Sequence, residues 1–159
     1  MGPVLLNPLV TGPRRGAHPL AIRLLVPVAL MTLLATACFT SEDQGSWSLV
    51  NASRQERGLP ALALDQELSN KAGAWATEMA NSGHLRHSNL PEDISQPWTA
   101  LGENVGSGPD PLAIHKGFLG SPSHYRTMMS DQYRSIGVGV AHSGDRRTVY
   151  VAHVFLKSD

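Results

Sequence analysis

The run Ile136-Gly137-Val138-Gly139-Val140 alternates β-branched residues with glycine, and it limits the fold more than any other segment of the chain. Alternation with a period of two predicts a β-strand. Glycine inside a strand has no side chain to pack, and it marks a place where another backbone approaches closely. The run therefore predicts a strand with one face pressed against the backbone of a neighbouring element.

A second strand is predicted directly after this one. Ser143-Gly144-Asp145 has the composition of a turn, and the residues from Thr148 to Leu156 are rich in Val, Tyr and Phe. Two strands joined by a short turn pair in antiparallel fashion. Because the helical signals all lie upstream, we expect an α+β domain in which helices cover a small sheet.

Four segments carry helical signals. The clearest begins at Asp65, a natural N-cap, and its apolar residues recur at helical spacing until Ser82-Gly83. A helix over about 48–57 is expected to stop at Gly58. Two more helices are predicted where a polar residue precedes proline, at Asp110-Pro111 and Ser121-Pro122.

The stretch over 84–108 shows little periodicity and is rich in Pro, Ser, Asn and Gly. Such a composition is typical of a loop. A loop of this length in a compact domain usually has a function, so we expect this one to contribute to a site.

Charge is distributed unevenly along the chain. All 13 acidic residues follow position 38, together with 10 of the 13 basic residues. This part is mildly acidic, and we expect no nucleic-acid partner because phosphate backbones are bound by basic surfaces. The other basic residues, Arg14, Arg15 and Arg23, stand in the N-terminal segment.

Residues 1–37 have the pattern of a signal peptide. The arginines lead into an apolar run over 24–34, and Ala35-Thr36-Ala37 suits cleavage. The run is too short to span a bilayer, which takes about 20 apolar residues. A membrane anchor that stays attached is the alternative. We expect export, either to the cell envelope or as a secreted protein.

Cys38 is the only cysteine, so it has no partner for an internal disulfide. The residues from Leu34 to Cys38 resemble a bacterial lipobox with the leucine one place early, which predicts lipidation of Cys38 and attachment to a membrane. Otherwise Cys38 is the first residue after ordinary cleavage. Residues 38–47 are polar and predict a short tether.

Three candidate site residues, His87, Glu103 and His124, lie in separate short polar segments. Imidazole and carboxylate groups together hold a divalent metal such as zinc. They also form acid/base pairs. Both interpretations require the three side chains to meet in the folded protein.

The order of several short motifs resembles the CAP superfamily of cysteine-rich secretory, antigen 5 and pathogenesis-related 1 proteins, and above all its short bacterial SCP-domain members. The resemblance runs from Leu49 to about Phe155, within the expected domain over 48–159, and implies an α-β-α sandwich around a three-stranded antiparallel sheet. It rests on Leu49-Val50-Asn51 with Arg54, Gly58-Leu59-Pro60, His87-Ser88, Gly102-Glu103-Asn104, Ser121-Pro122-Ser123-His124 and Ile136–Val140.

The resemblance also implies a cleft with two histidines and two acidic residues that binds a divalent metal in some members. His87 matches the first histidine and Glu103 matches the acid, whereas the second acid has no clear match. Tyr150 stands where the second histidine is expected, His153 stands where glutamine is usual, and His124 is placed on that side of the cleft. Ser88 and Asn104, beside the matched residues, are expected to line the cleft.

Three functional hypotheses follow. The first is an exported, envelope-attached module that binds a metal ion, a lipid or a peptide. The second is a hydrolase, either metal-dependent or assisted by His87 and Glu103. Ser88 is its candidate nucleophile, but adjacent residues rarely point at each other and no G-x-S-x-G sequence is present. The third is a scaffold with a vestigial cleft, which Tyr150 favours. We favour the binding module over catalysis.

Overall fold

The computed structural model describes residues 39–158, so the predicted signal peptide and Cys38 lie outside the described residues. Within this range no helix is both long and apolar enough to cross a membrane. The elements follow the order α1 (Ser41–Gln55), β1 (Ala63–Leu64), α2 (Gln66–Ser82), β2 (Ala100–Gly108), α3 (Pro111–Gly120), α4 (Pro122–Met128), β3 (Ser135–His142) and β4 (Val149–Lys157).

The sheet has four strands in the order β1-β3-β4-β2. Strands β2 and β3 pair with β4 in antiparallel fashion, which confirms the three expected antiparallel strands. The two-residue β1 adds to β3 in parallel and makes the sheet mixed. Strand β2 therefore forms one edge of the sheet.

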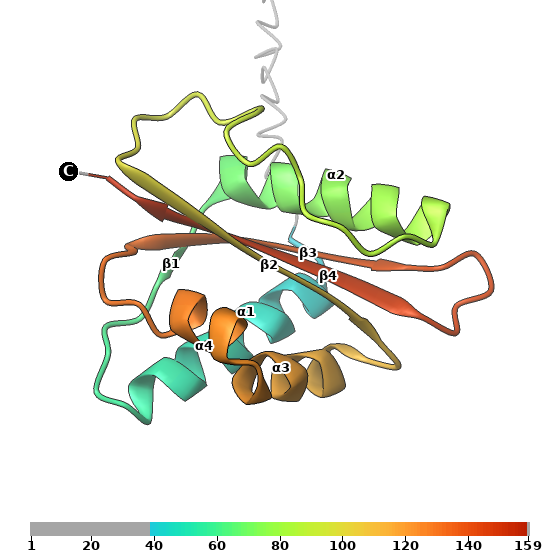
Figure 1. Ribbon diagram of the computed structural model, residues 1–159, viewed down its shortest axis with the longest axis horizontal. Coiled ribbons are helices and arrows are strands. Elements are labelled where there is room, and N and C mark those ends of the chain that lie inside the picture. The colour runs from blue at the N-terminus through green and yellow to red at the C-terminus, as the bar shows by residue number, and fades with distance from the viewer. Residues whose placement is uncertain (1–38, 159) are drawn as a thin grey trace, which may run out of the picture. The chain divides into compact units, whose positions relative to one another are not determined.

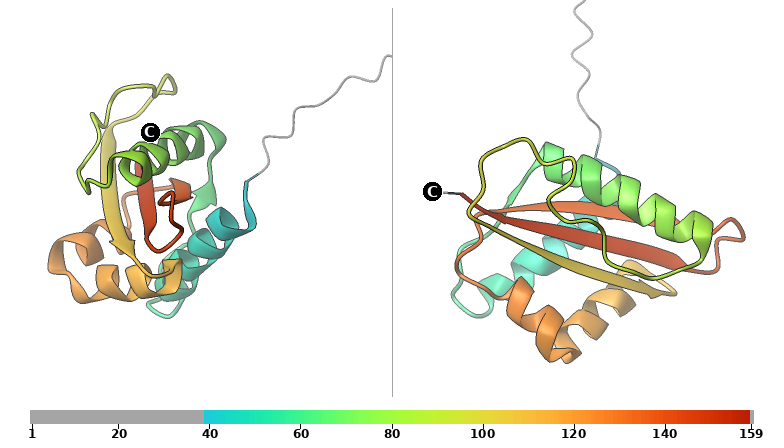
Figure 2. Two further views of the ribbon diagram at one scale, coloured as in Figure 1. Left: turned by 90° about the vertical axis from the view of Figure 1, so that its right-hand side faces the viewer. Right: turned by 45° about the horizontal axis from the view of Figure 1, so that its top comes forward.

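The sheet lies between two helical layers, as Figures 1 and 2 show, and the expected α-β-α sandwich is confirmed. Helix α2 covers one face, and its apolar residues pack with Val105, Val154 and Leu156 of the strands. Helices α1, α3 and α4 cover the other face, where Phe118 and Phe155 belong to a second cluster. Burial of both faces makes β4 the centre of the core.

The glycines of β3 allow α2 to lie directly on the sheet. A Cβ atom added to Gly137 would overlap the backbone of Leu68, and one added to Gly139 would overlap the backbone of Ala72. No side chain fits between these two elements, so the predicted close backbone approach is confirmed. The glycine pattern thus selects which helix covers this face.

The predicted helix starts are confirmed at two caps. The Asp65 carboxylate accepts a hydrogen bond from Leu68 N at 2.9 Å, and the Asp110 carboxylate accepts one from Ala113 N at 2.7 Å. Helix α2 ends at Gly83, whose φ of 70° is left-handed, as expected for a C-cap glycine. Ser121 precedes α4 without a side-chain cap bond.

Two expectations about the first half of the domain are wrong. The predicted tether over 38–47 is helical from Ser41 onward, because Thr40 and Asp43 form a capping box that starts α1 seven residues earlier than expected. The predicted loop over 84–108 ends at Thr99, and strand β2 follows it. Cross-strand pairing with the strongly apolar β4 stabilises β2, whose own sequence has weak strand propensity.

Helix α1 is held to the rest of the domain by buried polar contacts. Its Ser46 Oγ lies 2.8 Å from Nε2 of His153, and its Ser53 Oγ lies 2.9 Å from Nε2 of His115. Arg54 is fully buried and donates to the carbonyl oxygens of Pro60, Met128 and Ser130 at 2.8–2.9 Å. These contacts join α1 to β4, α3 and the end of α4.

Candidate functional site

Glu103 is the buried centre of the candidate site. Its side chain is only 3% exposed. One oxygen lies 2.7 Å from Nδ1 of His87 and accepts the Ser88 N–H at 3.0 Å, and the other accepts the Ser88 hydroxyl at 2.6 Å. Three donors offset the cost of burying a carboxylate, so Glu103 fixes the His87-Ser88 segment against β2.

His87 presents a free ring nitrogen to solvent. A carboxylate only accepts hydrogen bonds, so Nδ1 of His87 carries the proton that Glu103 binds. The side chain is 63% exposed, and the described part of the chain supplies no partner for Nε2. An imidazole oriented in this way by a carboxylate acts as a ligand or as a base through Nε2.

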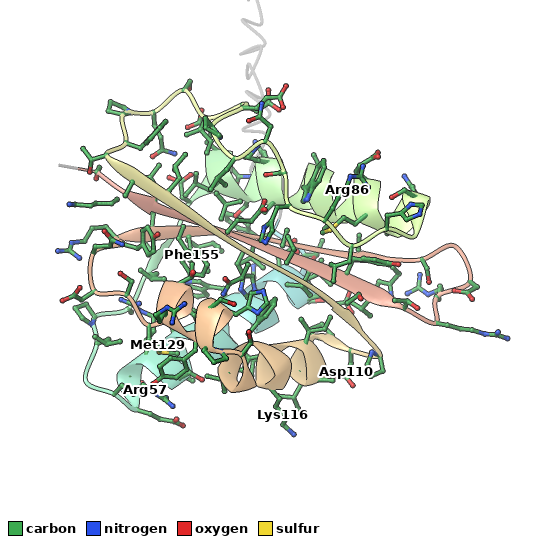
Figure 3. All side chains as sticks on the ribbon, in the orientation of Figure 1. Arg57, Arg86, Asp110, Lys116, Met129 and Phe155 are labelled. Atoms are coloured by element: carbon green, nitrogen blue, oxygen red, sulfur yellow. The ribbon has the colours of Figure 1, made fainter. Side chains whose placement is uncertain are left out.

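Helix α2 holds the segment that carries His87. Nε1 of Trp75 donates to the carbonyl oxygen of Arg86 at 2.9 Å, and the Arg86 guanidinium lies 4.9 Å from the Trp75 ring. Arg86, labelled in Figure 3, also pairs with Glu78 at 2.9 Å. Trp75 is half-buried at the edge of the core and anchors this segment.

His124 approaches the site from the other face of the sheet. It lies on α4, half-buried, with its ring 5.0 Å from that of Phe118. Burial lowers the pKa of His124, and the charge of His87 lowers it further. The Glu103 carboxylate bonds to His87 and Ser88 and makes no hydrogen bond to His124.

The donor set does not match a three-ligand metal site. Within residues 39–158, no three His, Cys, Asp or Glu side chains are grouped so that they could hold a metal ion. The oxygens of Glu103 bind His87 and Ser88, so this carboxylate orients an imidazole instead of completing a ligand set with His124. Zinc binding through His87, Glu103 and His124 stays a prediction, and the arrangement of these three side chains does not fit it.

A groove follows the edge of the sheet next to His124. We call it the β2 groove, and its volume is ≈ 280 Å³. Its floor is the backbone of β2, and its walls come from α3, α4 and the segment before His87. It is lined by Leu85, Val105, Gly106, Ser107, Ala113, Ile114, Gly117, Phe118, Ser121 and His124. Larger hollows of ≈ 580 and ≈ 540 Å³ lie along α1 and contain none of the candidate site residues.

Three residues expected to line the cleft are buried elsewhere. Tyr150 is 7% exposed and packs in the cluster under α2. His153 is fully buried on the opposite face, where desolvation lowers its pKa to about 3. Asn104 is 1% exposed, and its Nδ2 donates to the carbonyl oxygen of His124 at 3.0 Å, so it positions α4 from beneath.

Sequence reasoning misses the buried histidine–serine pairs under α1. His115 is 4% exposed and bonded to Ser53, and burial lowers its pKa. Ser46 and Ser53 stand seven residues apart, which places them on one face of α1 two turns apart. This seven-residue spacing is the sequence signal for the two pairs. The predicted helix starts at about residue 48 and so leaves Ser46 out, which hides the signal.

Comparison with known families gives one match over most of the chain. The family model described as the cysteine-rich secretory protein family, CAP, matches residues 47–155. The uncharacterized protein YkwD of Bacillus subtilis (strain 168) is 30% identical over 122 residues, which cover 71% of this chain and 48% of YkwD. The chain thus spans about half the length of this relative.

Two solved bacterial structures share the fold. An extracellular SCP-domain protein from Bacillus anthracis str. Ames has a TM-score of 0.63 at 23% identity, covering 74% of this chain and 40% of that protein. An outer surface protein from Borrelia burgdorferi has a TM-score of 0.67 at 21% identity, covering 77% of this chain and 97% of that protein.

Proposed function

Because the chain belongs to the CAP family of cysteine-rich secretory proteins, we propose that it is an exported binding module whose ligand contacts His87 and the β2 groove. Its predicted ligands are a metal ion, a lipid or a peptide. The extracellular description of the Bacillus anthracis neighbour supports export. The signal-peptide pattern over 1–37 supports it as well, and lipidation at Cys38 would keep the domain at the cell envelope.

The observation that carries the proposal is the orientation and exposure of the His87 ring in its pair with Glu103. A carboxylate that is 3% exposed orients an imidazole that is 63% exposed. Ordering an exposed ring costs conformational entropy, and an ion pair whose imidazole is largely exposed adds little stability to the fold. An oriented, accessible Nε2 is suited to contact a ligand, and this argues against a vestigial cleft.

The contacts of Ser88 favour binding over hydrolysis. Its hydroxyl donates to Glu103 at 2.6 Å, and no contact joins it to the His87 ring. A serine nucleophile needs a base that accepts its proton while its lone pairs face the substrate. Here the carboxylate that would support the base holds the hydroxyl instead, so Ser88 acts as an anchor for the segment.

A binding assay with a matched histidine control tests the proposal. The purified protein is titrated with Zn²⁺, with anionic phospholipid vesicles and with a random peptide library, using His87→Ala and His84→Ala beside it. His84 is also exposed but has no carboxylate partner. At least one probe should bind, and His87→Ala should weaken it about tenfold or more, as expected for loss of a charge-assisted contact, while His84→Ala leaves it unchanged.

Two outcomes would overturn the proposal. If none of the three probes binds, the proposal that the protein is a binding module is wrong. If the two variants bind equally well, His87 is not part of the binding site. Cleavage of casein that is lost in His87→Ala would transfer support to the hydrolase.

A further inference from the structure

The hydrogen-bond alternation of the sheet identifies which backbone groups of β2 face outward. Ser143 N donates to Thr148 O at 2.8 Å across the β3–β4 turn, so the even-numbered residues of β4 bond to β3. The odd-numbered residues then bond to β2, opposite Ala100, Gly102, Asn104, Gly106 and Gly108. Their neighbours in β2 therefore turn their N–H and C=O groups to the open edge.

Four residues of β2 have this outward orientation, namely Leu101, Glu103, Val105 and Ser107. Within residues 39–158 no hydrogen bond reaches their backbone atoms from outside the sheet. The strand also lacks the usual protection of an edge, because it contains no Pro, Lys or Arg. Its one charged side chain, Glu103, is turned to His87.

On the opposite side of the sheet, the outward backbone groups of β3 have partners. There, Ala63 N and Asp65 N donate to carbonyl oxygens of Arg134 and Ile136. Past the end of β1, side chains accept hydrogen bonds from the outward amides of β3. Val138 N donates to Ser69 Oγ at 3.1 Å, and Val140 N donates to Asp43 Oδ1 at 2.9 Å. The contrast shows that only β2 offers a row of unused backbone groups in the described part of the chain.

This open edge lies at the bottom of a groove. Val105, Gly106 and Ser107 form the floor of the β2 groove, and the first two are buried. Leu85, which is 49% exposed although apolar, lines the groove together with residues of α3. Of the four outward residues Val105 is buried, and a buried backbone group without a partner costs about 1–3 kcal/mol, so a ligand that supplies a partner there is favoured.

We infer that the β2 groove binds an extended peptide of another protein, which adds to the sheet as a strand beside β2. Only an extended backbone offers N–H and C=O groups at the spacing of Leu101 to Ser107. Alternate side chains of the peptide point into the apolar groove against Leu85 and α3. The inference rests on the proposed function, since the same groove carries His124 and lies beside His87.

A second copy of the chain does not suit this groove. Pairing of two β2 edges would bring the flanking walls of the two grooves against each other, because residues of α3, of α4 and of the Leu85 segment line the groove beside β2 in each copy. A single extended chain avoids this conflict. Self-association in solution is therefore an outcome that would count against the inference.

An N-methyl scan of a bound peptide tests the inference directly. Linear peptides long enough to run from Leu101 to Ser107 are selected from a random library against the purified protein. The selected sequence is then resynthesised with single N-methyl groups at each position. Methylation at every second residue should weaken binding about tenfold or more, because it removes one hydrogen bond to β2, and methylation at the residues between should leave binding unchanged.

A pair of protein variants locates the peptide. Gly117 lines the groove, and a Cβ atom added there meets no atom within 4 Å, so we expect Gly117→Leu to fill the groove without disturbing the fold. Gly120, also on α3 and equally open, does not line it, and Gly120→Leu is the matched control. We expect loss of peptide binding in the first variant alone.

The outcomes separate this inference from the proposed function. Peptides that bind without the alternating methyl pattern would overturn strand addition and leave the binding module in place. The same holds if only Zn²⁺ or vesicles bind at His87, or if sedimentation shows dimers that Gly117→Leu abolishes. If no probe binds at all, both proposals fail. Hydrogen exchange should show protection of the Val105 and Ser107 amides only when peptide is bound, and unchanged exchange would also overturn the inference.

Discussion

His153 should make the stability of this domain fall in mild acid. Its ring is fully buried, with Ser46 Oγ at 2.8 Å from Nε2 and the Phe118 ring at 5.4 Å. A protonated imidazole there has no carboxylate partner, so desolvation lowers its pKa from 6.5 to about 3, and the nearby His115 adds to this effect. The folded protein therefore binds this proton less readily than the unfolded chain.

The sign and size of the effect follow from linkage. A histidine whose folded pKa is lowered contributes stability above its unfolded pKa of 6.5, and that stability is lost as the pH falls toward about 3. Each pKa unit corresponds to about 1.4 kcal/mol, so the complete loss is about 5 kcal/mol. Between pH 7 and pH 5 the same two pKa values give a loss of about 2 kcal/mol.

Urea unfolding at pH 7, 6 and 5 measures this loss, with the double variant Ser46→Ala/His153→Leu as the comparison. Replacing both partners of a buried hydrogen bond by apolar groups is nearly neutral, so the double variant should fold. Its free energy of unfolding should fall about 2 kcal/mol less than that of the wild type between pH 7 and pH 5. His84→Gln, which removes an exposed imidazole, should follow the wild type.

Parallel losses of stability in the wild type and the double variant would refute the reasoning. They would mean that His153 takes up its proton without cost, and therefore that the ring is hydrated or paired with an acid in the folded protein. A variant that is unstable at pH 7 does not alter the test, because the comparison uses the slope of stability with pH.

Three further predictions rest on single contacts. Gly139→Ala should destabilise the domain by about 3 kcal/mol or more in urea unfolding, because the added Cβ overlaps the α2 backbone. The control Gly73→Ala adds a Cβ that meets no atom within 4 Å on α2, so it should be neutral or stabilising. Equal losses of stability in the two variants would contradict the packing argument. Asp65→Ala should cost about 1 kcal/mol through loss of the α2 N-cap, and an unchanged urea midpoint would contradict it. Glu103→Ala should speed hydrogen exchange of the Ser88 amide about tenfold or more, whereas unchanged exchange would show that other contacts hold this segment.

Predictions from local signals agree best with the structure. The caps at Asp65 and Asp110, the left-handed stop at Gly83 and the glycine pattern of β3 depend only on neighbouring residues or on the backbone they expose. The signal for the start of α1 is also local. Thr40 and Asp43 carry it, but the polar composition of the segment favours a tether and hides the capping box.

The candidate site is harder to predict because its residues are far apart in the chain. Family resemblance places His87 and Glu103 in one cleft, and the structure joins them at 2.7 Å. It gives Glu103 a different use, since the carboxylate also binds Ser88 and does not meet His124. Which oxygen bonds to which donor depends on the path of the 84–99 segment, and no periodicity describes that path.

The sequence by itself determined the four helices, strands β3 and β4, the close approach of another backbone to β3 and the resemblance to the family, because caps, glycine spacing and motif order are local features of the chain. It did not reveal strand β2 or the first residues of α1. Only the tertiary structure decided which face of β4 each residue occupies. That strand is buried on both faces, so no polar alternation distinguishes them. Tyr150 and His153, three positions apart, point to opposite faces, and the register with β2 and β3 sends both into the core and away from the predicted cleft. The same register leaves the outward backbone groups of β2 without partners.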